Sequence, residues 1–210
     1  MVCEAMDFAG GIASTNPARV QLAAGRVPAG IRKLDASSKW LVTAGQTAAV
    51  VIRHDVLSPY IVLGGIAASL LTAKIKRIVN QRRPAGSPLT DPGMPSSHAL
   101  VATFMSVAWV TQIQSSMISM MLLASAVLIS VLRVICGHHT WAQVGVGTAV
   151  GTVLSLVWMV LGQDIIRSPK SLETKVVYVM YAALSVLFLA KQIRKGRMRN
   201  AALKSESVLS

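Results

Sequence analysis

Six apolar stretches separated by polar or basic segments constrain the fold of this chain more than any other feature. A helix needs about 20 residues, within a range of roughly 17–25, to cross the hydrocarbon core of a bilayer. The second, fourth and fifth stretches reach this range, whereas the first and third are short and need tilting or polar flanks. An open sheet cannot satisfy its backbone in lipid, so we predict an all-α, polytopic membrane bundle of about six transmembrane helices. The stretches are 40–52, 56–73, 99–113, 117–136, 144–161 and 176–190.

The composition is typical of a membrane protein and indicates which kinds of partner it binds. Hydrophobic residues make up 53% of the 210 residues and charged residues 14%. The formal net charge of +13 comes from 21 Lys and Arg against 8 Asp and Glu. The basic residues lie beside apolar stretches, so they favour anionic lipid headgroups. We find no motif for DNA or RNA and therefore expect a lipid and bilayer partner and no nucleic acid.

The apolar stretches also set the organisation of the chain. We predict an N-terminal extension at 1–36, disordered or targeting, a membrane domain at 37–191 and a disordered basic polar tail at 192–210. Small residues such as Gly64, Gly65, Gly145, Gly147 and Gly151 permit close helix packing, although small residues are also simply common in membrane helices. With six spans, both termini lie on one side, and their basic bias places that side in the cytosol or its equivalent.

The first cluster of polar residues follows the second apolar stretch. Lys76 and Arg83 are seven residues apart, two helical turns, so on a continuous helix they share a face. Pro84 would then end the helix. Arg offers a bidentate fork for phosphate oxygens and Lys a mobile point charge. Taken alone, the segment also fits an ordinary basic loop.

The second cluster, Pro95-Ser96-Ser97-His98, opens the third stretch. Pro and Ser are typical of a helix start, and free N–H groups at such an end bind anions. His98 would lie within reach of a bound phosphate ester. Taken alone, the cluster also fits an ordinary N-cap with an interfacial His.

The third cluster comprises Arg133 and His139, around the end of the fourth stretch. Arg133 lies inside an apolar run, where an isolated charge is costly. His139 begins the approach to the fifth stretch, and an interfacial anchor is the alternative role. All three clusters fall on the same side of an alternating helix array, and together they predict a phosphate pocket with imidazoles for attack and proton transfer.

At these residues the chain resembles the type-2 phosphatidic acid phosphatase superfamily, which is related to the vanadium haloperoxidases. That family's pattern is K-x6-RP, PSGH and SR-x5-H-x3-D. Here Ser97 stands for the Gly, Leu132 for the Ser and Gln143 for the Asp. From about 38 to 150 the chain is more specifically similar to plant plastidial lipid phosphate phosphatases of the epsilon type. The strings GMPSSH and HTWAQ also resemble dolichyl diphosphatases.

The resemblance implies a phosphatidic acid phosphatase type 2/haloperoxidase-like core and a phosphohistidine mechanism. It makes His139 the nucleophile and His98 the acid and later the base. The phosphate oxygens would be bound by Lys76, Arg83, Ser96, Ser97 and Arg133. The scattered acidic residues form no obvious cage for a metal ion, so we expect no metal and no cofactor.

Gln143 departs from the family's orienting Asp. A Gln carbonyl can still accept the ring N–H of His139, but it supplies no negative charge. We expect Gln143→Asp to keep or raise activity and Gln143→Ala to lower it.

The sequence therefore predicts hydrolysis of phosphatidate to diacylglycerol and phosphate in an integral membrane, with the plastid (chloroplast inner) membrane favoured and the endoplasmic reticulum as the alternative. A dolichyl or polyprenyl diphosphatase is the second hypothesis. A catalytically silent lipid-binding membrane protein on the same fold is the third.

Overall fold

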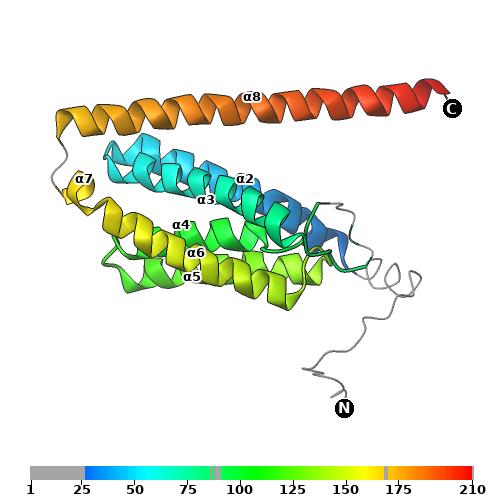
Figure 1. Ribbon diagram of the computed structural model, residues 1–210, viewed down its shortest axis with the longest axis horizontal. Helices are drawn as coiled ribbons and strands as arrows, with labels where there is room; N and C mark the ends of the chain where they lie inside the picture. The colour runs from blue at the N-terminus through cyan, green and yellow to red at the C-terminus, as the bar shows by residue number, and fades with distance from the viewer. Residues whose placement is uncertain (1–26, 86, 88–90, 168–169, 210) are drawn as a thin grey trace, which may run out of the picture.

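Helices form the regular structure throughout the part of the chain that the computed structural model describes, which comprises residues 27–85, 87, 91–167 and 170–209 (Figure 1). The prediction of an all-α membrane bundle is confirmed. A short helix, α7 (Gln163–Arg167), was not expected from the sequence. The described part contains six longer helices: α2 (Ala29–Arg53), α3 (Leu57–Val79), α4 (Ser97–Val110), α5 (Ser116–Ile135), α6 (Trp141–Leu161) and α8 (Ser171–Leu209).

Three of these helices, α3, α5 and α6, are long and apolar enough to cross a membrane. They contain the second, fourth and fifth apolar stretches, the same three whose length reached the spanning range. Helix α4 is apolar but has only 14 residues. Helices α2 and α8 contain the first and sixth stretches and continue well beyond them.

Two predicted domain boundaries fall within helices. Helix α2 begins at Ala29, so the boundary expected at residue 36 falls inside a helix. Residues 1–26 of the predicted N-terminal extension lie outside the described residues. Helix α8 runs on to Leu209 through the segment expected to be a disordered basic tail (Figure 1).

Helix α4 lies at the centre of the bundle, in contact with α3, α5 and α6. Its Leu100, Phe104 and Ala108 are almost completely buried and belong to the main hydrophobic core. The short helix is thus surrounded by longer ones, which explains how a 14-residue segment can sit at membrane depth. Because α4 begins with the second polar cluster, the packing of α4 fixes the position of that cluster.

Two of the small residues hold α4 against α6. A Cβ atom on Gly147 would lie 2.7 Å from the carbonyl oxygen of Ser96, and one on Gly151 would collide with the carbonyl of Leu100. The two glycines are four residues apart and therefore share the face of α6 toward α4. The close packing expected from the small residues is confirmed here, whereas a Cβ on Gly145 would meet nothing within 4 Å.

Candidate active site

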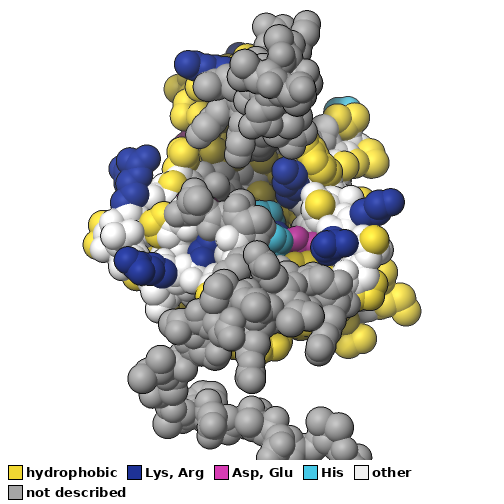
Figure 2. Space-filling model, turned by 90° about the vertical axis from the view of Figure 1, so that its right-hand side faces the viewer, with side chains coloured by type: hydrophobic (Ala, Val, Ile, Leu, Met, Phe, Trp, Pro, Cys, Tyr) yellow, Lys and Arg dark blue, Asp and Glu magenta, His cyan; other side chains and the backbone are white. Residues whose placement is uncertain are grey.

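The three polar clusters meet at one end of the bundle, where α3 and α5 end and α2, α4 and α6 begin (Figure 1). Figure 2 looks onto this end. A His surface lies beside an acidic one near the middle of the face, with Lys and Arg side chains around them. The sequence-based expectation that the clusters share one side of the helix array is therefore met in the arrangement of the helices.

The first cluster is not on one continuous helix, contrary to the sequence interpretation. Helix α3 ends at Val79, and Asn80 follows with a left-handed backbone (φ 44°) whose N–H donates to the carbonyl of Lys76. Asn tolerates this conformation better than most residues and commonly ends helices. Lys76 therefore lies in the last turn of α3, and Arg83 reaches the site from the irregular segment beyond it, before Pro84.

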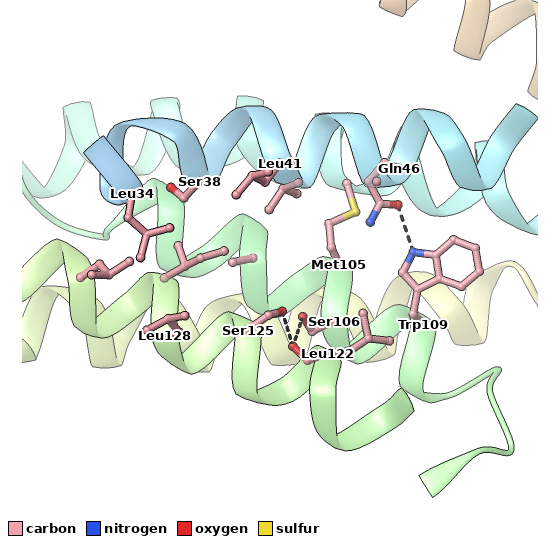
Figure 3. A pocket seen from close by; sticks show the side chains of 15 residues that line it. Leu34, Ser38, Leu41, Gln46, Met105, Ser106, Trp109, Leu122, Ser125 and Leu128 are labelled. Carbon is pink, nitrogen blue, oxygen red and sulfur yellow. Dashed lines mark hydrogen bonds between the residues drawn. The ribbon is translucent and has the colours of Figure 1, made fainter. Parts of the chain in front are cut away.

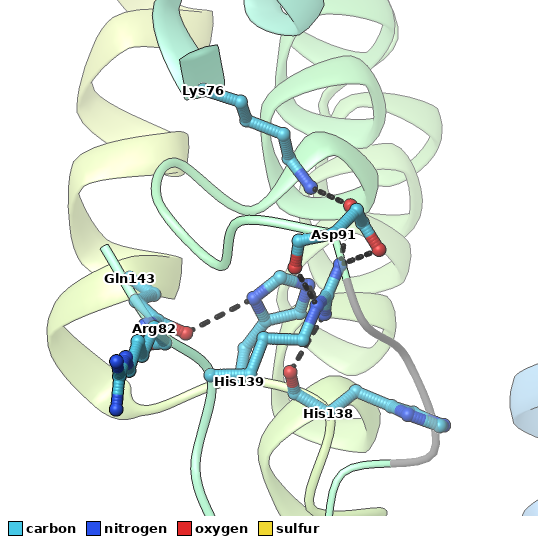
Figure 4. A network of polar contacts seen from close by, with 7 residues as sticks. Lys76, Arg82, Asp91, His138, His139 and Gln143 are labelled. Atoms are coloured by element: carbon cyan, nitrogen blue, oxygen red, sulfur yellow. Dashed lines mark hydrogen bonds and ion pairs between the residues drawn. The ribbon is translucent and has the colours of Figure 1, made fainter. Parts of the chain in front are cut away.

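Lys76 and Arg83 nevertheless converge, because both contact the carboxylate of Asp91; Figure 4 shows the contact between Lys76 and Asp91. Lys76 Nζ lies 2.8 Å from Asp91 Oδ2, and Arg83 NH2 lies 3.0 and 2.9 Å from the two carboxylate oxygens. Burial alone would raise the pKa of Asp91, but hydrogen bonds from the two cations and their charges lower it to about 2. Lys76 and Arg83 thus bind the carboxylate of Asp91. The same arrangement suits two oxygens of a phosphate group.

His139 lies directly against this pair. Arg83 NH1 is 2.9 Å from His139 Nε2 and donates to the backbone carbonyl of His138 at 2.8 Å. On the other side of the ring, His139 Nδ1 is 3.2 Å from Gln143 Oε1 (Figure 4). An amide oxygen only accepts and a guanidinium only donates. The proton therefore belongs on Nδ1, and the lone pair of Nε2 faces the cationic pocket.

The amide of Gln143 is held in a single orientation by four contacts. Its Nε2 donates to Gln81 Oε1 at 3.0 Å and to the carbonyl of Arg82 at 2.9 Å. Its Oε1 then faces His139 and also accepts from the N–H of Thr140 at 3.3 Å. The hydroxyl of Thr140, the N-cap residue of α6, accepts from the backbone N–H of Gln143, which completes a capping box. Gln143 is only 1% exposed, so this side chain joins the first and third clusters inside the protein.

The second cluster packs onto the same amide. A Cβ atom on Gly93 would lie 2.6 Å from Gln143 Nε2, so only glycine leaves room for this contact. The backbone N–H of Ser96 donates to the backbone carbonyl of Gln143 at 3.0 Å. The backbone N–H of Ser96, which we expected to bind phosphate, is therefore already used. The Ser96 hydroxyl is buried and has no hydrogen-bond partner among the described residues.

The environment of His139 keeps its ring neutral. Burial of the ring and then the charge of Arg83 lower its pKa to about 3, and the hydrogen bond that the ring donates to Gln143 opposes this only in part. A neutral imidazole can act as a nucleophile, whereas the protonated ring cannot. At neutral pH the ring of His139 is therefore unprotonated.

His98 and Ser97 occupy the first turn of α4, and both are partly buried. His98 makes no side-chain hydrogen bond to any described residue, but it lies close enough to Arg133 and Asp35 for their charges to act on its ring. The backbone carbonyl of Arg133 accepts from the N–H groups of His138 and His139. Arg133 therefore adjoins both His98 and His139, the two histidines with predicted chemical roles.

Arg133 has a carboxylate partner that the sequence interpretation missed. Arg133 NH1 lies 2.8 Å from Asp35 Oδ2, and the two side chains are 7% and 5% exposed. His138 Nε2 lies 3.3 Å from the same oxygen. Arg133 Nε, Asp35 Oδ1 and His138 Nδ1 are buried without a hydrogen-bond partner in the described part of the chain. The sequence did indicate that Arg133 needs a partner, because a buried, unpaired Arg is costly. It did not identify that partner, because Asp35 lies 98 positions earlier.

The arrangement as a whole can bind a phosphate group beside a nucleophile. Lys76, Arg83 and Arg133 supply three positive charges, His139 presents a lone pair, and the Ser96 hydroxyl is available as a donor. In the described residues, His, Cys, Asp and Glu side chains do not gather in any group of three that could hold a metal ion. Charge neutralisation and positioning are what phosphoryl transfer chiefly needs from a protein.

Comparisons with known proteins identify the family of this chain. The family described as the PAP2 superfamily matches residues 59–167. Lipid phosphate phosphatase epsilon 2, chloroplastic, of Arabidopsis thaliana is 35% identical over 163 residues, covering 73% of this chain and 57% of that protein. Its epsilon 1 counterpart is 33% identical over 166 residues, covering 74% and 60%. This chain thus spans less than two thirds of the length of these relatives.

Two further similarities are more distant. Dolichyldiphosphatase 1 of Mus musculus is 30% identical over 125 residues, covering 50% of this chain and 52% of that protein. The crystal structure of a transmembrane PAP2 type phosphatidylglycerolphosphate phosphatase from Bacillus subtilis superposes with a TM-score of 0.57. It covers 74% of this chain and 88% of its own, at 21% identity. At that identity the superposition supports the fold alone.

Proposed function

Because this chain belongs to the PAP2 superfamily, we propose that it is a membrane phosphatase that hydrolyses phosphatidate to diacylglycerol and phosphate. The observation that carries the proposal is the position of His139, whose Nε2 lies 2.9 Å from Arg83 NH1 at the edge of the cationic pocket while Nδ1 lies 3.2 Å from Gln143 Oε1. A phosphate bound by Lys76 and Arg83 would be next to a nucleophile of fixed tautomer. The same residues carry the family's motifs.

In the first step, His139 Nε2 attacks phosphorus, and the bond between phosphorus and the glycerol oxygen breaks. His98 gives a proton to the departing oxygen, which leaves as the hydroxyl of diacylglycerol. The product on the protein is a phosphohistidine with a positively charged ring. The carbonyl oxygen of Gln143 accepts from Nδ1–H and stabilises that charge, less strongly than a carboxylate would.

In the second step, water attacks the phosphorus of the phosphohistidine. His98, now unprotonated, takes a proton from the water, and the bond between phosphorus and Nε2 breaks. Phosphate is released and both histidines return to their starting forms. Lys76, Arg83, Arg133 and the hydroxyl of Ser96 neutralise the oxygens in both steps, with an N–H from Ser97 at the start of α4 as a further donor. The mechanism uses no metal ion.

The similarity to chloroplastic lipid phosphate phosphatases supports a lipid phosphate, the class to which phosphatidate belongs, as substrate and a plastid membrane as location. The similarity to dolichyldiphosphatase 1 supports a second candidate, hydrolysis of a polyprenyl diphosphate. Both substrates are lipid-anchored phosphates and would use the same chemistry at His139. A fluorescent fusion of the full chain, imaged against plastid and endoplasmic reticulum markers, tests the location.

The activity is tested with the full chain purified in detergent. Phosphate release is measured from phosphatidate and from a polyprenyl diphosphate, in EDTA. We expect faster release from phosphatidate, trapping of an acid-labile phosphohistidine after denaturation, and loss of both signals in His139→Ala.

The matched control is His54→Asn. His54 is exposed between α2 and α3, at the other end of the bundle, and its left-handed backbone (φ 50°) suits Asn. Release that persists in His139→Ala would refute the nucleophile. Release only from the polyprenyl diphosphate would refute the substrate, and complete loss in EDTA would refute the metal-independent mechanism.

A further inference from the structure

An apolar groove lies between α2, α4 and α5 and runs along the bundle (Figure 3). Its volume is about 310 Å³, at the lower end of the ~300–1,000 Å³ of ligand pockets. The floor is formed by buried residues, among them Ala102, Met105 and Leu132, whereas rim residues such as Leu41 (62% exposed) are open. A groove of this shape is accessible from the lipid phase along its side.

The hydroxyl groups and the indole N–H that line the groove have hydrogen-bond partners within the protein itself. Ser106 and Ser125 both donate to the carbonyl of Leu122, at 2.8 and 2.7 Å. Trp109 Nε1 donates to Gln46 Oε1 at 3.0 Å (Figure 3). Ser38 donates to the carbonyl of Asp35 at 2.7 Å. No lining hydroxyl or indole N–H is thus left to bind a polar ligand, so the groove is suited to hydrocarbon.

One end of the groove adjoins the proposed catalytic groups. Leu34 and Leu132 line it, and each is the sequence neighbour of a member of the Asp35–Arg133 ion pair. On α4, Ala102 lies four residues after His98, so it is on the same face one turn further along. The groove therefore starts on the side of the His that protonates the departing oxygen, and that oxygen is the atom to which the lipid tails are attached.

The length of the groove matches one layer of lipid tails. From Leu34 to Gln46 it follows twelve residues of α2, about 18 Å at 1.5 Å per residue. Half of a bilayer's hydrocarbon core is about 15 Å. Its small volume admits one chain rather than two. We propose that this groove binds one acyl chain of phosphatidate while the phosphate lies against His139. The proposal rests on the function proposed above.

Gly45 allows the groove to be narrowed without disturbing the fold. It lines the groove, and a Cβ atom there would meet nothing within 4 Å, so the side chain of Gly45→Leu would enter open space. Gly45 lies eleven residues after Leu34, about 16 Å along α2. An eight-carbon chain cannot exceed about 11 Å, since a carbon–carbon bond is about 1.5 Å long, and would end before Gly45. An eighteen-carbon chain would reach it.

The test compares dioleoyl and dioctanoyl phosphatidate in mixed micelles. We expect Gly45→Leu to lower kcat/KM at least tenfold for the dioleoyl lipid and less than twofold for the dioctanoyl lipid. The matched control is Gly30→Leu, on the same helix but outside the groove, where a Cβ also meets nothing; it should change neither value. Equal loss with both lipids, or no loss with either, would overturn the proposal.

A binding experiment separates this proposal from the proposed reaction. A phosphatidate with a photoreactive diazirine near the methyl end of one eighteen-carbon chain is cross-linked to the full chain and to His139→Ala. We expect the label on residues near Gly45 and Trp109, and its loss in Gly45→Leu, whether or not phosphate is released. Label on α6 or α8, or label blocked by a polyprenyl phosphate but not by dioleoyl phosphatidate, would refute an acyl chain in this groove.

Discussion

Gln143 offers the sharpest test of how His139, the proposed nucleophile, is oriented. The substitution Gln143→Met keeps an unbranched side chain of similar length but removes the acceptor for His139 Nδ1–H at 3.2 Å. The site then has a buried ring N–H without a partner at the moment when the ring becomes positively charged. Losing a hydrogen bond to a charged group costs about 1.5–3 kcal/mol. At about 1.4 kcal/mol for each tenfold change, kcat should fall about 10- to 150-fold.

The substitution Gln143→Glu should separate catalysis from stability. The carboxylate retains the acceptor and adds the negative charge that stabilises a protonated ring, so we expect kcat to equal or exceed that of the wild type. It also loses the N–H groups that donate to Gln81 and to the Arg82 carbonyl, at 3.0 and 2.9 Å. An unsatisfied buried carbonyl costs about 1–3 kcal/mol, so the thermal midpoint should fall.

The structure also changes what we expect of Gln143→Asp. From the sequence alone, Asp was expected to keep or raise the activity. In the folded protein, Asp is one methylene shorter and lacks the N–H groups that join α6 to Gln81 and Arg82. Glu, rather than Asp, is therefore the acidic substitution that tests the charge at this position without withdrawing the side chain from His139.

The assay is phosphate release from micellar phosphatidate at saturating surface concentration, with the thermal midpoint measured in the same detergent. Gln112→Met, at an exposed position at the far end of α4, is the matched control and should change neither quantity. An unchanged kcat in Gln143→Met would refute the orienting role. A loss in Gln143→Glu as large as in Gln143→Met would show that the position serves packing alone.

Three further predictions concern groups around the nucleophile. Asp35→Asn should leave Arg133 buried without its counter-charge and lower kcat/KM at least tenfold, with a lower thermal midpoint; activity and midpoint equal to wild type would contradict this. His139 should stay neutral from pH 8 to pH 5 by ¹⁵N NMR, because its pKa is lowered to about 3. Stability should fall as the pH drops below about 6.5, where the unfolded chain takes up the proton, and a ring titrating near pH 6.5 would refute this. Gly147→Ala should cost about 1–3 kcal/mol by overpacking α6 against α4, whereas Gly145→Ala should be nearly neutral, and equal midpoints would contradict the packing argument.

The parts of the fold that the sequence predicted are those that depend on local composition. Apolar length alone located α3, α5 and α6, and the alternation of helices placed the polar clusters at one end. The end of α3 was wrong because it depends on one residue, Asn80, whose left-handed backbone stops the helix four residues before Pro84. The start of α2 was predicted too late because its first turns lack a hydrophobic signal. Asp35, in the second turn, is buried although it is charged.

The contacts within the site were harder to predict because their partners are distant in the sequence. Lys76 and Arg83 were identified as cations for phosphate, yet nothing local indicated that Asp91 binds both. The Thr140-x-x-Gln143 pattern of a capping box was present in the sequence and would have predicted that Gln143 lies in the first turn of α6. The contacts of Gln143 with Gln81 and Arg82 depend on how the segment after α3 packs against α6, which no local pattern specifies.

A common physical reason connects the two carboxylates that the sequence interpretation left out. Cations at membrane depth are costly unless they are paired, and a phosphatase needs its cations between catalytic cycles as well as during them. Here Asp91 pairs with Lys76 and Arg83, and Asp35 pairs with Arg133. Each carboxylate comes from a segment outside the histidine motifs, at the same end of the bundle. A basic motif for phosphate in a membrane protein therefore predicts acidic residues on the same side of the membrane, and these can be sought by topology even when their spacing is irregular.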